Sequence, residues 1–478
     1  MTPRWATCSV PRCKKPRDRK DGGCEKCSRN LCYKHASRSF HHCTPDEELD
    51  EPTWQAERAA ALDRLRSEIN LAAAAQYASE LSDGRACSAE HTNMRGGLNY
   101  HVRIRFHDGA TPWLLRIPQF RGLDRAPLSV IEQGLISEYA TLKFLEGTAV
   151  PAPRAFGYGL LSDGTDQGIG AGFLLMEELP GKPWYNPGRT DDDNRDEKTK
   201  ILSGVADIMA ELARHPFPKA GSLYLEGSRL EVGPVPIDLF RALDPVGPFE
   251  SAIEYYTAWA EGHLELIADR QVYLDYPVEA YLVYRFLKDN VGQLVQPRGR
   301  DRTEEQPREE FFLKHVDDRG DYLLVDDDHN ITGVIDWQMA RVVPKCEAFG
   351  PSLVTVNLAS FYKGDVSPSE DDVYLRDALR EKGHAELARW MDDENSKLRR
   401  FCYGLAFEIK WSDALPLANG ILKVFGVKQE WEEWKEMALK EYSDDKRLQA
   451  VVKSCAPRRP HLPRRSKQAV RDSGKKKG

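Results

Sequence analysis

The spacing of apolar and polar residues changes several times along the chain, and each change predicts a new element. Residues 55–81 are rich in Ala, Leu, Glu and Arg, lack Gly and Pro, and carry apolar side chains at helical spacing, so we expect one long helix there. Residues 96–106 and 112–118 alternate apolar and polar side chains on either side of a His-Asp-Gly turn, which predicts two paired strands. Residues 128–145 return to helical spacing and predict a second helix.

The rest of the chain begins with strands and continues with helices. We expect strands at 154–160 and 172–176, and helices at 198–214, 249–272, 281–287 and between 361 and 442. Residues 296–310 are almost wholly polar and predict an exposed loop. Two short apolar runs, residues 323–326 and 331–336, flank the sequence Asp-Asp-His-Asn, which predicts a hairpin.

The stretch from residue 311 to 338 combines this hairpin with residues suited to phosphoryl transfer. His315 and Asp317 lie in a loop before the hairpin, and Asp336 ends its second strand, 336 − 317 = 19 residues after Asp317. The loop and the strand end can therefore place Asp317 and Asp336 at the opening of one site. One carboxylate could orient a substrate hydroxyl while the other holds the Mg²⁺ that bridges the phosphates. A solvated acidic hairpin is the alternative interpretation, and we expect it for the aspartates at 326–328.

A glycine pair opens the first predicted hairpin. Gly96 and Gly97 would let the backbone approach phosphate groups closely, and Arg116 on the following strand could pair with those phosphates. Glu138, on the helix at 128–145, could hold Arg116 in place through an ion pair. Glycines more often mark simple turns, so a phosphate-binding role for this pair is supported only by the residues that follow it.

These residues belong to motifs that run in the order GGLNYHVRIRF, WLLRIP, SEYATLKFL, MEELPG, HVD and IDW. In this order the chain resembles the aminoglycoside phosphotransferase family, most closely its fungal branch, from about residue 92 to 351. The resemblance implies an α+β, bilobal protein-kinase-like fold with a small β-rich lobe and a large helical lobe. It implies that MEELPG is the hinge whose backbone receives the adenine of ATP, which places Met176 and Glu177 beside the nucleotide. It also implies that Arg116, paired with Glu138, steadies the phosphates.

The same resemblance assigns roles in the catalytic loop. His315 and Asp317 match the family pattern H-G-D-x-x-x-x-N, with Asp317 as the base, and Asp336 matches its Mg²⁺ ligand. Tyr322 stands where the pattern has its metal-binding Asn, and a phenol is a poor ligand for this hard cation. Asp321, one residue earlier, could replace the Asn as a metal ligand if the loop is shifted.

Two functions are consistent with these matches and departures. The first is ATP- and Mg²⁺-dependent transfer of a phosphoryl group to a hydroxyl of an unidentified small molecule, which the retained acidic and basic residues favour. The second is a catalytically impaired pseudokinase-type adaptor that uses its two ends to bind protein or nucleic acid. Tyr322 favours the adaptor, as does Val316 in place of the family's small glycine.

Six of the ten cysteines fall within the first 43 residues and are interleaved with histidines. The eight candidate zinc ligands are Cys8, Cys13, Cys24, Cys27, Cys32, His35, His41 and Cys43. Two structural zinc ions would each take four of them, and the metal would supply the folding energy that so short and polar a segment cannot gain from a hydrophobic core. A disulfide framework is the alternative, and it is favoured only in a secreted chain.

The order of these ligands resembles the AN-one type of zinc finger of stress-associated proteins, although four residues separate Cys8 from Cys13 where two are usual. The resemblance implies that one ion is bound by Cys8, Cys13, Cys32 and His35, and the other by Cys24, Cys27, His41 and Cys43. His42 competes with His41 for its place. Four later cysteines lack metal spacing and are expected to be free thiols: Cys87, Cys346, Cys402 and Cys455.

Composition adds general expectations. The 478 residues, 41% hydrophobic and 30% charged, can bury a large core and predict two or more domains. No apolar run reaches the length of a membrane span or a signal sequence, so we expect an intracellular protein, cytoplasmic or nuclear, with no membrane partner. The net charge of −7 gives the whole chain no general attraction to nucleic acid.

Basic residues nevertheless gather at both ends of the chain. The basic loop at 14–20 is either a solvated face or a contact for an acidic or phosphate-rich partner, so a protein partner of the finger stays open. The basic tail is either a disordered solubilising segment, a nuclear-import signal or a nucleic-acid-binding arm.

These observations divide the chain into six expected segments. In order, we expect a two-zinc finger at 1–44, an acidic linker at 45–54, a helical extension at 55–91, the small lobe at 92–180, the large lobe with catalytic loop and acceptor pocket at 181–446, and a disordered basic tail at 447–478.

Overall fold

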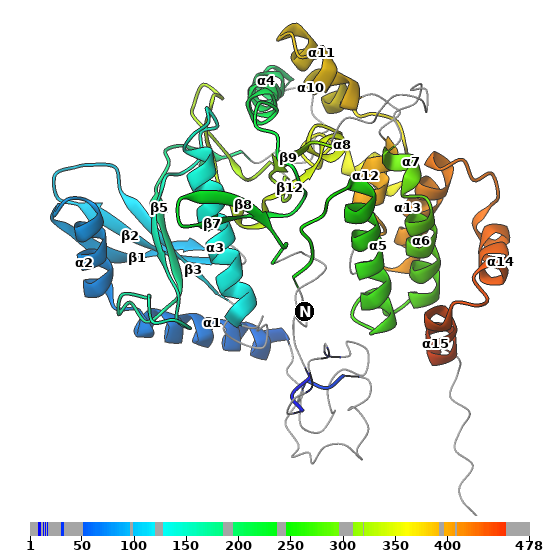
Figure 1. The fold of residues 1–478 in the computed structure, drawn as a ribbon, viewed down its shortest axis with the longest axis horizontal. Helices are drawn as coiled ribbons and strands as arrows, with labels where there is room; N and C mark the ends of the chain where they lie inside the picture. The colour runs from blue at the N-terminus through cyan, green and yellow to red at the C-terminus, as the bar shows by residue number, and fades with distance from the viewer. Residues whose placement is uncertain are drawn as a thin grey trace, which may run out of the picture.

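The computed structural model describes residues 8–10, 13, 15, 17, 30–32, 51–95, 99–119, 128–184, 195–236, 245–295, 309–318, 320–391, 396–406 and 409–455. Its main body has two lobes, one built around a sheet and one composed largely of helices (Figure 1). The predicted α+β bilobal fold is therefore confirmed. None of the described helices is long and apolar enough to span a membrane. Outside the described residues lie the tail after residue 455 and the predicted site residues Gly96, Gly97, Cys24, Cys27, His35, His41 and Cys43.

The small lobe contains a five-stranded antiparallel sheet with the strand order β1-β2-β3-β5-β4. Its strands are β1 (Cys87–Arg95), β2 (Asn99–Phe106), β3 (Trp113–Pro118), β4 (Ala155–Gly159) and β5 (Phe173–Glu177). The predicted hairpin is confirmed as β2 and β3. The sequence did not predict β1, and the glycine pair belongs to the connection between β1 and β2.

Two helices, α1 (Glu51–Glu68) and α2 (Leu71–Leu81), replace the single long helix that the sequence predicted, so that prediction was wrong. The break falls at Asn70, whose side chain accepts a hydrogen bond from the Ala73 amide and so caps α2. The Asn70 amide donates to the carbonyl of Ile169 at 2.9 Å. This amide therefore bonds to a residue outside the helix and does not continue α1. Helix α1 also begins four residues earlier than expected, within the predicted acidic linker.

Alternation along β2 gives the sheet two unlike faces. One face packs against α1 and α2 and forms a core of its own, to which β2 contributes Tyr100, Val102, Ile104 and Phe106. The other face looks toward α3 (Leu128–Leu145), which covers the sheet on the side opposite α2 (Figure 1). Arg116 on β3 pairs in register with His101 on β2, so both side chains lie on this second face.

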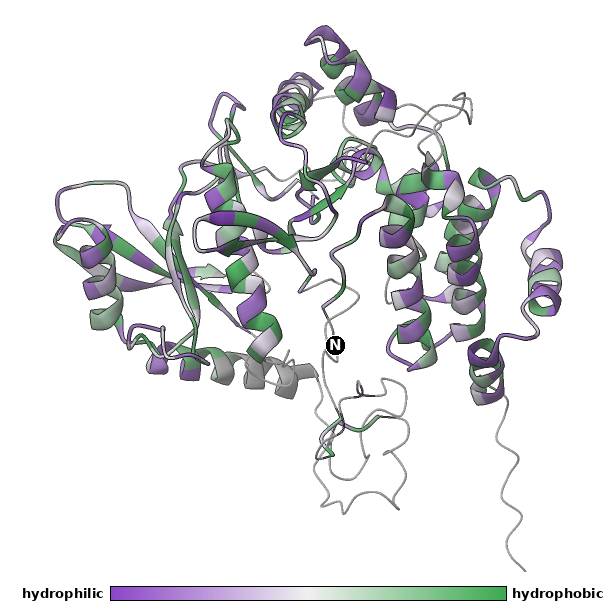
Figure 2. Ribbon diagram, viewed as in Figure 1, coloured by the Kyte–Doolittle hydropathy of each residue, from purple (hydrophilic) through white to green (hydrophobic). Residues whose placement is uncertain are grey.

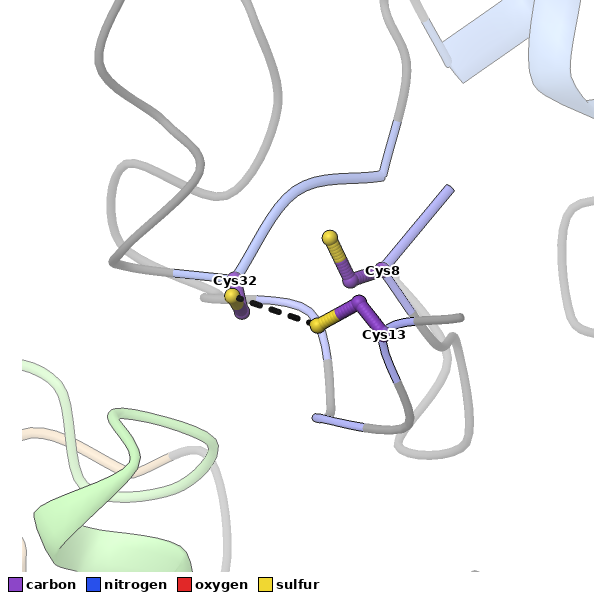
Figure 3. Close-up of side chains that lie close together, drawn as sticks. All are labelled: Cys8, Cys13 and Cys32. Atoms are coloured by element: carbon purple, nitrogen blue, oxygen red, sulfur yellow. Dashed lines mark hydrogen bonds between the residues drawn. The ribbon is translucent and has the colours of Figure 1, made fainter. Parts of the chain in front are cut away.

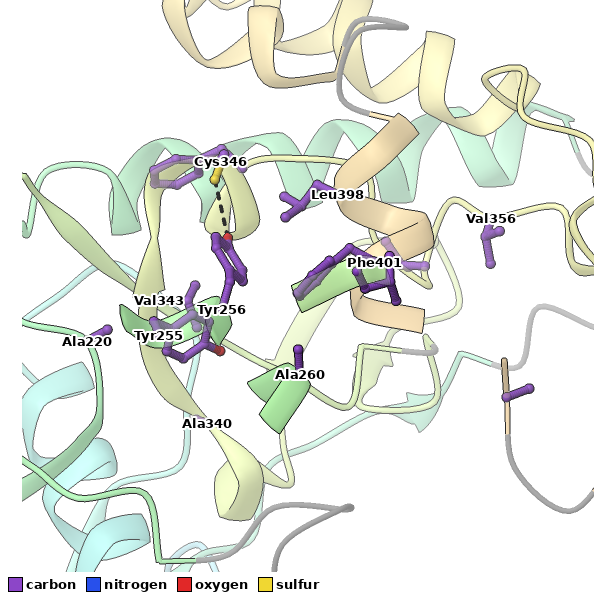
Figure 4. Packing of buried hydrophobic residues seen from close by; sticks show 14 of the residues in the cluster. Ala220, Tyr255, Tyr256, Ala260, Ala340, Val343, Cys346, Val356, Leu398 and Phe401 are labelled. Atoms are coloured by element: carbon purple, nitrogen blue, oxygen red, sulfur yellow. Dashed lines mark hydrogen bonds between the residues drawn. The ribbon is translucent and has the colours of Figure 1, made fainter. Parts of the chain in front are cut away.

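The large lobe is organised around α5 (Ala252–Ala268) and α6 (Pro277–Asp289), which lie side by side. Figure 2 shows hydrophobic and hydrophilic bands along both helices, as expected for helices with one buried face. Tyr256 and Phe401 are fully buried in the core beside α5, and the Tyr256 hydroxyl lies 3.3 Å from the sulfur of Cys346 (Figure 4). The described cysteines after residue 44 are free thiols, as predicted.

The remaining elements of this lobe are mostly short. They are α4 (Arg195–Leu212), β7 (Ser222–Glu226), β8 (Arg229–Gly233), α7 (Gly292–Val295), α8 (Lys345–Ala348), α9 (Leu358–Tyr362), α10 (Glu370–Glu381), α11 (Ala385–Ala388), η4 (Arg389–Met391), α12 (Ser396–Tyr403), α13 (Trp411–Val424), α14 (Trp431–Glu441) and α15 (Lys446–Cys455). Helix α15 contradicts the prediction that the tail is disordered from residue 447. Leu448 and Val451 bury one face of the helix, and Asp445 accepts from the amides of Arg447 and Leu448 at its start.

Four short strands hold the segment that carries the candidate site. They are β9 (Phe311–Lys314), β10 (Leu323–Val325), β11 (Ile331–Val334) and β12 (Arg341–Pro344), and a 3-10 turn η3 (Trp337–Met339) precedes β12. β10 and β11 form the predicted hairpin, and β9 pairs with β12. β10 also pairs with β6 (Lys182–Pro183), which follows the predicted hinge, so the hairpin is tied to the connection between the lobes.

Candidate active site

The loop from His315 to Tyr322 is fastened at both ends to one residue, Ile335. The Ile335 carbonyl oxygen lies 2.8 Å from His315 Nε2, and the Ile335 amide donates to the Tyr322 carbonyl at 2.9 Å. Asp317 lies inside this loop, and Asp336 directly follows Ile335. The structure thus brings together the loop and the strand end that the sequence predicts to converge.

His315 is buried and points toward the strand end. A carbonyl oxygen only accepts hydrogen bonds, so Nε2 donates the hydrogen in this contact. Nδ1 is buried without a hydrogen-bond partner among the described residues. The ring stacks on Tyr322 at a centroid distance of 4.2 Å and meets the edge of Trp337 at 5.0 Å. The histidine therefore fixes the shape of the loop.

Tyr322, which stands at the Asn position of the expected pattern, is buried in the large-lobe core. Burial raises the pKa of its phenol well above the ordinary value, so the group stays protonated. A neutral phenol stacked on His315 is not arranged as a metal ligand. Asp321 is exposed, and in the described part of the chain no hydrogen bond or ion pair joins it to Asp336.

Asp317 is half-buried, whereas its neighbour Asp318 is buried. Asp318 accepts a hydrogen bond from the Leu353 amide at 3.2 Å, and its other oxygen lies 3.8 Å from Lys314 Nζ. Asp318 thus anchors the loop to the segment after α8. This role was not predicted from the sequence, although the two adjacent aspartates at 317 and 318 are a visible signal.

Asp336 adopts a left-handed backbone conformation, with φ of 64° and ψ of 47°. A non-glycine residue rarely takes this conformation, so the turn between β11 and η3 is locally strained. The turn leaves the Asp336 side chain 55% exposed while Trp337, the next residue, is buried. The Trp337 indole donates to the Val334 carbonyl at 2.8 Å, and the ring is part of the large-lobe core.

Arg116 joins the predicted residues from three separate elements. Its guanidinium donates through Nη1 to Glu138 on α3 and through Nη2 to Asp336 after β11. Arg116 and Glu138 are almost completely buried, with 3% and 2% of their surface exposed. A buried guanidinium requires such partners because an unpaired buried charge is costly. The predicted pairing of Arg116 with Glu138 is present.

Two titratable groups beside Arg116 have shifted pKa values. The pKa of Glu138 is raised to about 7, chiefly by burial; the Arg116 charge opposes this rise and the Asp336 charge contributes to it. Burial lowers the pKa of His101 to about 4, and the positive charge of Arg116 acts in the same direction. His101 therefore stays neutral at neutral pH, with its Nδ1 buried and lacking a hydrogen-bond partner among the described residues.

Two polar residues that were not predicted from the sequence complete this junction. Gln338 Oε1 accepts hydrogen bonds from Arg116 Nη2 at 3.0 Å and from Asn99 Nδ2 at 2.9 Å. Asn99 is the second residue after the glycine pair, and Gln338 follows the Ile-Asp-Trp motif. Their positions beside these two motifs could have identified them as site residues.

The predicted hinge, residues 176–181, begins with the last two residues of β5. Met176 is buried, and the amides of Glu177 and Glu178 donate to the carbonyls of Arg154 and Pro112 at 2.9 and 3.0 Å. Leu179 has the first hinge amide that makes no hydrogen bond with the described residues.

The segment around the hinge is fixed by side-chain contacts at two points. Arg103 forms two hydrogen bonds with the Glu178 carboxylate, at 2.7 and 2.5 Å. The Thr332 hydroxyl donates to the Pro180 carbonyl at 2.7 Å, which connects the hinge to β11.

Three of the predicted zinc ligands lie together near the N-terminus. The sulfur atoms of Cys8, Cys13 and Cys32 all lie within 4.8 Å of one another (Figure 3). Cys8 and Cys32 are buried, and none of the three forms a disulfide within the described part of the chain. These are the described members of the first predicted ligand set.

Comparisons with known proteins place this geometry in context. No curated protein matches the chain. Three solved structures resemble it at low identity. A candidate aminoglycoside phosphotransferase from Ralstonia eutropha is 14% identical, with 78% of this chain and 99% of that chain covered and a TM-score of 0.41. A type I macrolide 2'-phosphotransferase is 15% identical, with 74% and 98% covered and a TM-score of 0.36. An ethanolamine kinase from Plasmodium vivax is 12% identical, with 74% and 81% covered and a TM-score of 0.38.

The sequence model of the phosphotransferase enzyme family matches residues 96–390, which is 390 − 96 + 1 = 295 of the 478 residues. The match begins at the glycine pair before β2, includes the loop and Asp336, and ends within η4, before α12. The chain belongs to the phosphotransferase enzyme family.

Proposed function

We propose that the protein transfers the γ-phosphoryl group of ATP, in a Mg²⁺-dependent reaction, to a hydroxyl group of a small molecule. The observation that carries the proposal is the junction of Arg116, Glu138 and Asp336, which are drawn from β3, α3 and the turn after β11. Phosphoryl transfer depends on positioning and on charge stabilisation rather than on covalent chemistry, and this junction offers both.

The adenine would lie against the hinge, where the Leu179 amide is available as a donor. The phosphates would lie beneath the turn between β1 and β2, with the guanidinium of Arg116 beside them. Glu138, held within α3, prevents Arg116 from swinging away. Arg is suited to this place because its planar fork matches phosphate oxygens.

The Asp336 carboxylate fits a magnesium ion by its chemistry. Hard divalent cations prefer carboxylate oxygens, and Mg²⁺ is often held by one or two carboxylates together with phosphate oxygens and water. The half-exposed Asp336 could supply such an oxygen, whereas the buried Tyr322 could not. When bound, the ion would bridge and neutralise the phosphate oxygens.

Asp317 is the proposed base, because it lies in the loop that His315 and Tyr322 fasten beside Asp336. Its carboxylate would accept the proton of the attacking hydroxyl. His315 would act through this loop as a positioning residue, because its Nε2 hydrogen is committed to Ile335.

An ATP-consumption assay across a panel of hydroxylated metabolites tests the proposal. The wild-type protein should consume ATP with at least one acceptor when Mg²⁺ is present. The variant D317N should lose this activity by about a thousandfold, given the 10²–10⁴-fold typical of a positioned base, and still bind ATP. An unchanged rate in D317N would contradict the assignment of the base.

A nucleotide-binding adaptor is the second candidate function, and the position of Tyr322 favours it. With Tyr322 buried, the usual second metal ligand of the loop is missing. An adaptor would bind Mg²⁺-ATP without consuming it and would use the N-terminal segment or the basic tail for protein or nucleic-acid partners. Binding without turnover across the panel is the result that distinguishes it.

We also propose that the N-terminal segment binds structural zinc. Tetrahedral geometry with Zn–S bonds of about 2.3 Å gives sulfur–sulfur separations of roughly 3.8 Å. The Cys13 and Cys32 sulfur atoms lie 3.9 Å apart, which fits a shared ion and is too long for a disulfide. His35 would complete this set, and Cys24, Cys27, His41 and Cys43 would hold a second ion.

Metal analysis of freshly purified protein tests the zinc proposal. Two zinc ions per chain are expected, falling to one in the variant C32S, with C455S as a control that keeps both. A wild-type zinc content near zero would overturn it.

A further inference from the structure

The carboxamide oxygen of Gln338 is shared by two strands of the small lobe. It accepts from Asn99 at the start of β2 and from Arg116 on β3. Only 9% of Gln338 and 4% of Asn99 is exposed, and Arg116 is equally well buried. Hydrogen bonds in such a water-poor setting are stronger than those at the surface. This contact is therefore suited to fixing the direction of the guanidinium.

The orientation of a guanidinium group is fixed only when both of its terminal nitrogens, Nη1 and Nη2, have hydrogen-bond acceptors. A lysine ammonium is a point charge that one carboxylate can fix, but a planar guanidinium can rotate about a single anchored nitrogen. Glu138 holds Nη1, whereas Asp336 and Gln338 both accept from Nη2. If Asp336 turned its oxygen toward a metal ion, Gln338 would be the acceptor that stays on Nη2.

The neutral charge of Gln338 matters as much as its position. Arg116 already faces two carboxylates, those of Glu138 and Asp336. A third carboxylate would repel phosphate groups and further neutralise the guanidinium. An amide supplies an acceptor oxygen without adding negative charge.

Asn99 connects this acceptor to β2. It is the first residue of that strand, and its donation to Gln338 ties the start of β2 to the turn that carries Asp336. The start of β2, the Arg116 guanidinium and the Asp336 turn therefore share one acceptor atom.

We infer that Gln338 is a positioning residue that aims Arg116 at the nucleotide phosphates and keeps the start of β2 in register with it. This inference rests on the proposed function and deepens it. It predicts an effect on phosphate recognition that leaves recognition of the base unchanged.

Calorimetric titration of the full chain with Mg²⁺-ADP and with adenosine tests this inference. Q338L removes the acceptor at similar size, and Q338E keeps the acceptor but adds charge. Loss of a hydrogen bond to a charged group corresponds to about tenfold in affinity. Both variants should bind Mg²⁺-ADP about tenfold more weakly than wild type and bind adenosine equally well. Q76L, the same change at an exposed residue of α2, should bind both ligands as wild type does.

Two results would overturn the inference, and a third would overturn the proposed function. Equal Mg²⁺-ADP affinity in wild type, Q338L and Q338E would overturn it. An equal loss for adenosine and Mg²⁺-ADP in both variants would also overturn it, because that pattern indicates a general structural role. Wild-type protein that binds neither ligand would instead overturn the proposed function on which the inference rests.

Discussion

His315 Nε2 donates its hydrogen to the Ile335 carbonyl oxygen at 2.8 Å, and this bond joins the loop that contains Asp317 to the strand end that presents Asp336. The proposed base, Asp317, and the proposed metal ligand, Asp336, therefore belong to two segments that the His315 side chain connects. The histidine achieves this from a buried position between two aromatic rings.

Replacing His315 should therefore impair turnover more than nucleotide binding. H315L removes the donor and should lower kcat by roughly tenfold to a hundredfold, because small displacements of a reacting group are that costly. H315Q retains an N–H that can reach the Ile335 carbonyl and should recover part of the rate. H107N, at an exposed turn, is the control that should behave as wild type. Equal rates for H315L and H315Q would contradict a role for this hydrogen bond.

Restoring the family's Asn at position 322 should not create a better enzyme. Tyr322 fills space in the core, so Y322N should leave a cavity and lower the free energy of unfolding by about 3 kcal/mol. Y322F should be nearly neutral, because the Tyr322 hydroxyl makes no hydrogen bond with the described residues. Denaturant unfolding measures both changes. A Y322N protein as stable as wild type and faster in turnover would show that position 322 faces the site.

The stability of the fold should fall in acid because of His101. Its pKa is lowered from 6.5 to about 4 by burial and by Arg116, so the folded protein keeps it neutral while the unfolded chain binds a proton below pH 6.5. The unfolded state then binds more protons, and stability falls as the pH falls from about 6.5 to about 4. The contribution amounts to about 3 kcal/mol at pH 4.

The variant H101Q isolates this contribution, since glutamine cannot titrate. Melting temperatures measured between pH 7 and pH 4 should decline less steeply in H101Q than in wild type. Parallel curves would show that His101 is not held neutral by the fold.

Local patterns in the sequence were sufficient to identify several parts of this arrangement. Arg116 and Glu138 lie on a strand and a helix with clear periodicity, so their elements and their pairing could be predicted. Asp336 stood out at the end of a predicted strand. In each case the prediction depended on the chemistry of the side chain and on the periodic spacing of apolar residues around it.

The missed features depend on contacts between distant segments. The bond between Asn99 and Gln338 spans 239 positions, and no period along the chain encodes it. Whether Tyr322 faced the mouth or the core also depended on the packing of a loop. The break between α1 and α2 did have a local signal, because Asn70 precedes an apolar run as a helix N-cap does.

The metal dependence of ATP binding tests the central claim most directly. Calorimetric titration of the full chain with ATP should show binding in the presence of Mg²⁺ that is about tenfold tighter than in EDTA, as expected if one carboxylate shares the ion with the phosphates. D336A should erase this difference, whereas D327A, at the exposed hairpin tip, should retain it. Binding that is unaffected by Mg²⁺ in the wild type, or a full metal effect in D336A, would contradict the account.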